Sequence, residues 1–111
     1  MKLALLNTTI ATTDGLYEIK TVTLGTAKSL VHHALDAGVE LDSAIGHEST
    51  AAIMSELLDT DIPVNRQMFA QQEGQQALVF KLKGRAPEGV ILSSEEIETI
   101  GYEFKIMTRT A

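Results

Sequence analysis

Apolar residues in the first part of the chain follow two spacings in turn, which predicts alternating strands and helices. Residues 2–7 (KLALLN) are almost continuously apolar, as in a central strand that is covered on both faces. Residues 16–24 (LYEIKTVTL) alternate between apolar and polar and are rich in β-branched side chains, which is typical of a strand. From Ala27 the apolar residues recur at helical spacing, and Gly38 provides a helix stop.

The same alternation continues to residue 58. Residues 8–15 (TTIATTDG) form a hydroxyl-rich loop that ends in an Asp-Gly turn signal. Residues 39–45 (VELDSAI) predict a third strand. A helix is expected over residues 47–58, and its inner stripe would be formed by Ile53, Met54, Leu57 and Leu58.

The last third of the chain adds a hairpin, a short helix and a final strand. Residues 64–72 and 76–83 predict the two arms of a hairpin that turns at Glu73-Gly74. Ser93 to Glu96 has the spacing of a capping box and predicts a helix from Ser94. Residues 102–110 (YEFKIMTRT) read as the last strand. The expected fold class is α/β, a mixed sheet of about five to six strands covered by helices in a single compact domain spanning residues 1–111.

Composition restricts the setting in which this domain works. The chain has 111 residues, of which 44% are apolar, so one domain with a proper core is expected. It has no cysteine, which excludes disulfides and makes a cytoplasmic location the default. No window approaches the roughly 18 apolar residues of a membrane span, and the apolar run after Met1 is too short for a secretory signal. We therefore expect no membrane partner.

Charge argues against binding to DNA but leaves room for a smaller anion. The formal net charge is −6, whereas non-specific DNA binding needs a basic surface. Residues 66–88 are the exception, because four Lys or Arg residues there face two Glu residues. A defined anionic ligand could bind in this region.

Within that region the most useful side chain is Arg85. Period-two alternation puts Lys81 and Lys83 on one strand face, where a solvated surface is the simplest interpretation. Arg85 follows the strand end, with Glu88 three residues later in a Pro-Glu-Gly loop. A guanidinium held there could make a bidentate contact with phosphate.

The three histidines differ in context. His32 and His33 lie off the apolar stripe of their helix and are expected to be solvated, and no spacing supports a metal site. His47 projects between Met54 and Leu58, which favours a half-buried core histidine.

The chemistry around His47 favours function instead. A helix N-terminus offers free N–H groups to an anion, Gly46 lets a ligand approach the backbone, and the hydroxyls of Ser49 and Thr50 follow. A histidine there would suit a general acid near neutral pH. The pattern alone leaves both interpretations open.

Three longer stretches carry a family resemblance. "SAIGHEST", "PVNRQMFAQQEGQQALVFKLKGRAPEG" and "EEIETIGYEFKIMTRT" resemble the viral anti-CRISPR ring nuclease family and its cellular and mobile-element homologues. The specific feature is the A-[IV]-G-H-x-S-T core followed about fifteen residues later by Asn-Arg. The resemblance covers nearly the whole chain.

The resemblance implies a C2 homodimer that binds cyclic tetra-adenylate, a second messenger of type III CRISPR defence, across the dimer. Members cut the ring without metal or cofactor into linear di-adenylate with 2′,3′-cyclic phosphate ends. By this resemblance His47 would be the general acid, Arg85 would stabilise the transition state and Glu88 would orient one of these two. The implied substrate-binding residues are Asn7, Thr8, Thr9, Gly46, Ser49, Thr50 and Arg66.

Two other functions remain open from sequence. The chain could sequester a cyclic oligonucleotide without cutting it, because a sponge or sensor needs the same pocket. It could also be a structural or interaction protein of a mobile element, in which His47 is merely packed.

Overall fold

The computed structural model describes residues 1–84 and 93–111, and it has the expected α/β architecture. Its radius of gyration of 13.4 Å matches the value of about 13 Å expected for a compact domain of this length. The elements in chain order are β1 (Leu3–Leu6), β2 (Tyr17–Val22), α1 (Leu24–Asp36), β3 (Leu41–Ser43), α2 (Glu48–Leu58), β4 (Gln76–Leu82), α3 (Ser94–Ile100) and β5 (Tyr102–Arg109). The five strands form one mixed sheet in the order β2-β5-β4-β1-β3.

Strand β1 lies inside the sheet, with parallel neighbours on both sides. It pairs with β3 through Leu5 and Ser43, and with β4 through Leu5 and Leu78. Strand β5 is antiparallel to both β4 and β2. All four residues of β1 are buried, which confirms the prediction of a central strand from residues 2–7.

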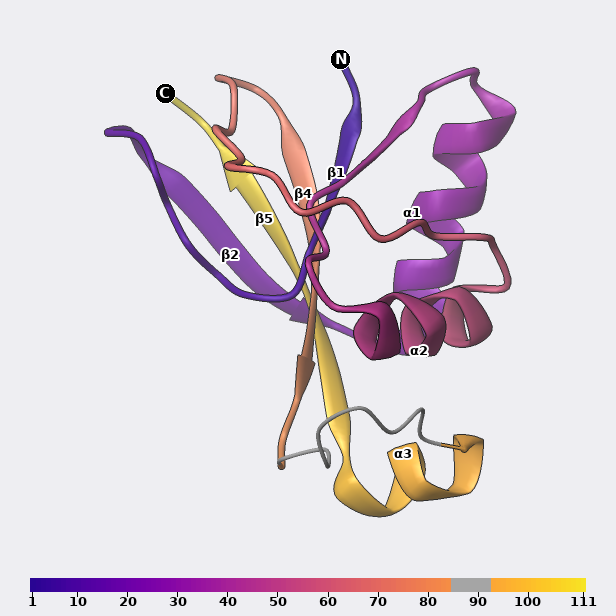
Figure 1. Ribbon diagram of the computed structural model, residues 1–111. Helices are drawn as coiled ribbons and strands as arrows, with labels where there is room; N and C mark the ends of the chain where they lie inside the picture. The colour runs from indigo at the N-terminus through magenta and orange to yellow at the C-terminus, as the bar shows by residue number, and fades with distance from the viewer. Residues whose placement is uncertain (85–92) are drawn as a thin grey trace.

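The main core lies between the sheet and the helices (Figure 1). Helices α1 and α2 cover the same face of the sheet, and α3 lies at the far end of the β4–β5 pair. Phe80 and Phe104 are buried against each other, with ring centroids 5.2 Å apart. The Tyr102 ring completes this aromatic group, and the pKa of its phenol is raised first by burial and second by the nearby Glu98 carboxylate.

The opposite face of the sheet carries a second, smaller core. Its buried members are Ala4, Leu6, Ala77, Val79 and Met107, with Tyr17, Ala44 and Phe69 packed against them. Val79 is therefore buried, although it shares a strand face with the exposed Lys81. The loop segments that follow β1 and α2 approach this face, so it is not simply solvated.

The end of β2 and the start of α1 differ from the prediction because Thr23 caps the helix. The side chain of Thr23 accepts a hydrogen bond from the Thr26 N–H at 3.1 Å and starts α1 at Leu24, before the first expected apolar position. Strand β2 consequently ends at Val22. Strand β3 is also shorter than residues 39–45, because pairing with β1 covers only its middle.

The predicted hairpin is wrong. Residues 64–72 contain no strand, and β4 pairs instead with β1 and β5. The turn signal at Glu73-Gly74 favoured a ladder between its two flanking segments, but this segment bonds to neighbouring carbonyls through the side-chain amides of Asn65, Gln67 and Gln71. The turn at Glu73-Gly74 is present, and Gly74 has the positive φ of 80° that such a turn requires.

The C-terminal predictions are confirmed. Ser93 and Glu96 form both hydrogen bonds of a capping box at the start of α3, and β5 covers most of residues 102–110. Among residues 1–84 and 93–111, no helix is long and apolar enough to cross a membrane.

The packing predicts which substitutions destabilise the fold. Phe80→Ala removes a ring that is 1% exposed and should lower the free energy of unfolding by about 3–5 kcal/mol. Ser29→Ala is the control, because Ser29 is exposed on α1 and its substitution should cost less than about 0.5 kcal/mol. Urea unfolding followed by circular dichroism measures both values, and similar losses in the two variants would contradict this packing.

Candidate functional site

The predicted site residues follow strands that end at one edge of the sheet. Strands β1, β3 and β4 are parallel, so their carboxyl ends meet there, the place where α/β sheets commonly bind ligands. Asn7 follows β1, His47 follows β3, and Lys83 follows β4. The topology therefore brings together segments that are far apart in the sequence.

His47 is an exposed residue and not part of the core. It is the N-cap of α2, with extended backbone angles of φ −123° and ψ 127°. Projection onto the inner stripe assumed helical angles, so the expected burial between Met54 and Leu58 is wrong. Its side chain makes no capping hydrogen bond, which leaves the imidazole available to a ligand.

The first turn of α2 surrounds His47 with groups suited to an anion. Ser49 and Thr50 are half-buried, and the first-turn N–H groups of a helix have no intrahelical acceptor. The Glu48 carboxylate also lies in this turn and opposes a second negative charge. Arg85 and Glu88, the two other predicted catalytic residues, lie outside the described residues.

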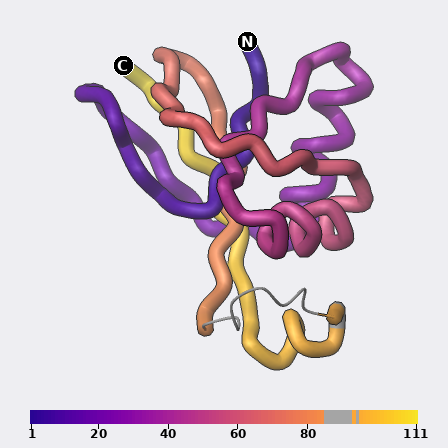
Figure 2. The backbone as a smooth tube through the Cα atoms, in the orientation of Figure 1, coloured from indigo at the N-terminus to yellow at the C-terminus, as the bar shows by residue number. Residues whose placement is uncertain are grey.

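Residues 62–67 run beside the connection from β3 to α2 (Figure 2). The Asn65 N–H donates to the Ile45 carbonyl at 2.9 Å, and its side-chain amide donates to the Ser43 carbonyl at 3.0 Å. The buried Ser43 hydroxyl donates in turn to the Pro63 carbonyl at 2.6 Å. The residues leading to His47 are thus held from outside the sheet.

Arg66 lies against Gly46. A Cβ built on Gly46 would lie 3.4 Å from the Arg66 Nε and 3.5 Å from its Cγ, which is ordinary contact. The space that the glycine leaves open is therefore filled by the arginine stem and not by free solvent. This brings Arg66 next to the residue that precedes His47, as a shared site would require.

A cavity of about 170 Å³ joins the loop after β1 to this region. It is lined by Leu6, Asn7, Thr8, Ile10, Thr12, Ala44, Gln67, Met68 and Phe69. The Thr12 hydroxyl donates to the Phe69 carbonyl and holds the loop over it. Of the predicted substrate-binding residues, Asn7 and Thr8 line this cavity. His47 does not, and neither do the other predicted substrate-binding residues, Thr9, Gly46, Ser49, Thr50 and Arg66.

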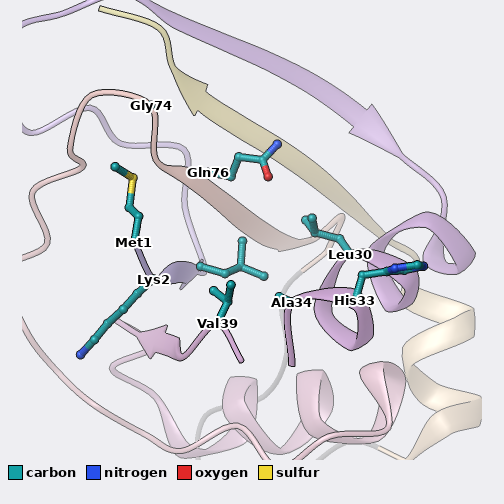
Figure 3. Close-up of a pocket in the computed structure, with 9 residues that line it drawn as sticks. Met1, Lys2, Leu30, His33, Ala34, Val39, Gly74 and Gln76 are labelled. Atoms are coloured by element: carbon teal, nitrogen blue, oxygen red, sulfur yellow. The ribbon is translucent and has the colours of Figure 1, made fainter. Parts of the chain in front are cut away.

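A larger cavity of about 320 Å³ lies at the other end of β1 (Figure 3). Met1 and Gly74 stand on one side of it, and Leu30, His33 and Ala34 of α1 stand on the other. It contains none of the predicted site residues. Its lining is mostly apolar, as expected for a space between the end of a helix and the sheet. The volume of a cavity does not by itself indicate a function.

The other two histidines behave differently. His33 is exposed as predicted, but His32 is half-buried, with its Nε2 2.9 Å from the Leu58 carbonyl. It joins α1 to the carboxyl end of α2, where a carbonyl without an intrahelical donor needs a partner. Within the described residues, no group of three His, Asp or Glu side chains could hold a metal ion.

Sequence reasoning missed the residues that hold the site. Asn65, Ser43 and Gln67 were not predicted to act there, although the Asn-Arg pair was part of the family motif. The polar Asn65 and Gln67 within the predicted strand were the available signal.

Comparisons with known proteins agree with this fold. A family profile described as STIV B116-like matches residues 3–104. The chain is 36% identical over 109 residues to the protein YddF of Bacillus subtilis (strain 168), covering 98% of each. It is 35% identical over 102 residues to protein 26 of Sulfolobus islandicus filamentous virus, covering 79% of this chain and 86% of the viral protein.

A solved structure gives the same result in three dimensions. B116 of Sulfolobus turreted icosahedral virus (STIV) superposes with a TM-score of 0.82 at 25% identity, covering 98% of this chain and all of B116. The likeness spans the complete sheet and its helices.

The exposure of His47 predicts that it contributes little to stability. His47→Ala should change the free energy of unfolding by no more than about 0.5 kcal/mol, because the side chain is exposed and makes no capping bond. Urea unfolding measures the change. A loss of about 2 kcal/mol or more would restore the interpretation of a packed histidine.

Proposed function

This chain belongs to the STIV B116-like family, and we propose that it is a ring nuclease that cleaves cyclic tetra-adenylate without metal. The products would be linear di-adenylates with 2′,3′-cyclic phosphate ends. The observation that carries the proposal is the exposed, uncapped imidazole of His47 at the N-terminus of α2. The resemblance of the His47 motif to ring nucleases supplies the reaction.

The chemistry needs few protein groups. The ribose 2′-oxygen attacks the adjacent phosphorus, its proton passes to solvent, and the bond from phosphorus to the 5′-oxygen breaks. His47 as the imidazolium donates a proton to that departing oxygen and is reprotonated by water. Holding the attacking and leaving oxygens in line accounts for much of the remaining acceleration.

The phosphate would be held at the start of α2. The first-turn N–H groups and the hydroxyls of Ser49 and Thr50 are suited to bind its oxygens. Arg85 is assigned to the charge that develops on phosphorus, and Glu88 to the orientation of Arg85 or His47.

The ring itself would lie over the neighbouring segments. Asn7, Thr8 and Thr9 on the loop after β1 are assigned to ring contacts, as is Arg66 beside Gly46. The 170 Å³ cavity adjoining these residues has both apolar walls and amide groups, a mixture suited to a nucleobase.

A second copy of the chain would complete the pocket. Several large apolar side chains are exposed, among them Ile10, Leu16, Ile19, Val64 and Met68. Burying such side chains between two copies is favourable, and a two-fold dimer would offer matching halves to a ring of four equivalent nucleotides. In a cell this reaction would switch off type III CRISPR signalling in the cytoplasm.

Turnover of labelled cyclic tetra-adenylate with excess chelator tests the activity. The wild-type protein should release di-adenylate with cyclic phosphate ends over many turnovers, and His47→Ala should reduce the rate by about 10²-fold or more. His33→Ala is the matched control, because it removes an exposed histidine on α1 that has no assigned part in the reaction, and it should leave the rate unchanged.

Other outcomes would decide for the rivals. Stoichiometric binding without product would mean that the protein is a sponge or sensor. Neither binding nor product, with melting unchanged by the ring, would favour a structural or interaction protein.

The dimer is tested separately by mass. The chain should elute at about twice 12.0 kDa, and Met68→Asp should shift it toward the monomer because it places a charge among the exposed apolar side chains. Lys28→Asp on α1 serves as a control for added negative charge. A wild-type monomer that cleaves the ring would contradict the shared pocket.

A further inference from the structure

We propose that Asn65 is a positioning residue that sets the place of His47 through the backbone of residues 43–47. The inference rests on the proposed function for its role in catalysis, but its structural part can be tested without substrate. Asn65 does not touch the imidazole. It acts through the stretch of chain that carries His47 from β3 to α2.

Asn65 makes two contacts that a strand would otherwise supply. Its N–H donates to the Ile45 carbonyl at 2.9 Å, and its side-chain amide reaches the Ser43 carbonyl at 3.0 Å. These two carbonyls are two residues apart, as are the acceptors that an extended strand presents along one edge. One asparagine thus continues the edge of β3 up to the residues before His47.

The bonds close a loop that contains His47. The Ser55 hydroxyl of α2 donates to the Ala51 carbonyl at 2.7 Å and accepts from the Ile62 N–H at 2.9 Å. Ile62 begins the segment that ends at Asn65 and returns to β3. The chain therefore leaves β3, passes His47, follows α2 and bonds back to its own starting point.

The far end of α2 is also fixed. The His32 imidazole, from α1, lies 2.9 Å from the Leu58 carbonyl. The carboxyl end of α2 is thus held by α1 and its middle by Ile62. The contacts of Asn65 hold the chain that enters the helix at its amino end.

Loss of the Asn65 amide should leave the fold intact. Gln67 also donates to the Ser43 carbonyl, at 2.7 Å, so this carbonyl keeps a partner when Asn65 is truncated. Asn65 is an exposed residue, so its side chain is not part of a core. A change in catalysis would then report on geometry and not on unfolding.

The experiment combines kinetics with histidine NMR. The chain has three histidines, so the His33→Ala and His47→Ala spectra assign all three imidazole signals. Asn65→Ala should move and broaden the His47 signal alone, while kcat falls by about 10-fold to 10²-fold and KM stays within about twofold. Asn65→Asp, which replaces the donor with an acceptor of the same size, should do at least as much.

The matched control is Gln72→Ala, which removes an exposed amide from the same connection. The structure gives this side chain no part in the contacts to β3, and the variant should match wild type in signals and rate. An unchanged His47 signal with an unchanged kcat in Asn65→Ala would overturn the inference. Movement of all three signals with a lower urea midpoint would reduce Asn65 to a structural residue and would also overturn it.

Failure of the proposed function looks different. If the wild-type protein cleaves no ring, no rate can be measured for any variant. The His47 signal then still reports whether Asn65 sets the position of the imidazole.

Discussion

The burial of β1 on both faces is the constraint on which the rest of the structure depends. Its side chains alternate between the main core and the second core, and its backbone is hydrogen-bonded to β3 on one side and β4 on the other. The buried part of β1 is only four residues long, and beyond it no apolar side chains cover the chain. A polar loop therefore follows the strand. Asn7 and the threonine-rich loop therefore begin at the edge where β3 and β4 also end.

The same constraint explains why a histidine can be exposed beside a dense core. Ile53, Met54 and Leu58 are buried under the sheet, so α2 is fixed by its middle and its carboxyl end. Its first residue extends past the sheet edge, where water and the free N–H groups of the first turn meet. A polar side chain at this point needs no buried partner. The imidazole and the free N–H groups of the first turn therefore lie together at this edge.

The sequence predicted the class of fold, the central strand, the capping box and most element positions, because periodicity reports which side chains are buried. It failed where backbone angles depart from the assumed element. The helical projection of His47 fails because an N-cap is extended, and the strand predicted over residues 64–72 rested on the turn that follows it. Asn65 bonds through its side chain, and such long-range contacts leave no periodic trace. The assignments of Arg85 and Glu88 stay predictions from family resemblance.

The contacts of residues 62–67 along β3 have a consequence for how the protein behaves at high concentration. A sheet has two borders, and an unpaired border can recruit another chain and start aggregation. Here a non-strand segment occupies the Ser43 and Ile45 carbonyls at one border, which leaves fewer free acceptors for further pairing. The other, β2, carries the oppositely charged Glu18 and Lys20, which disfavour uncontrolled stacking of strands. Both borders of the sheet thus carry features that oppose further strand pairing.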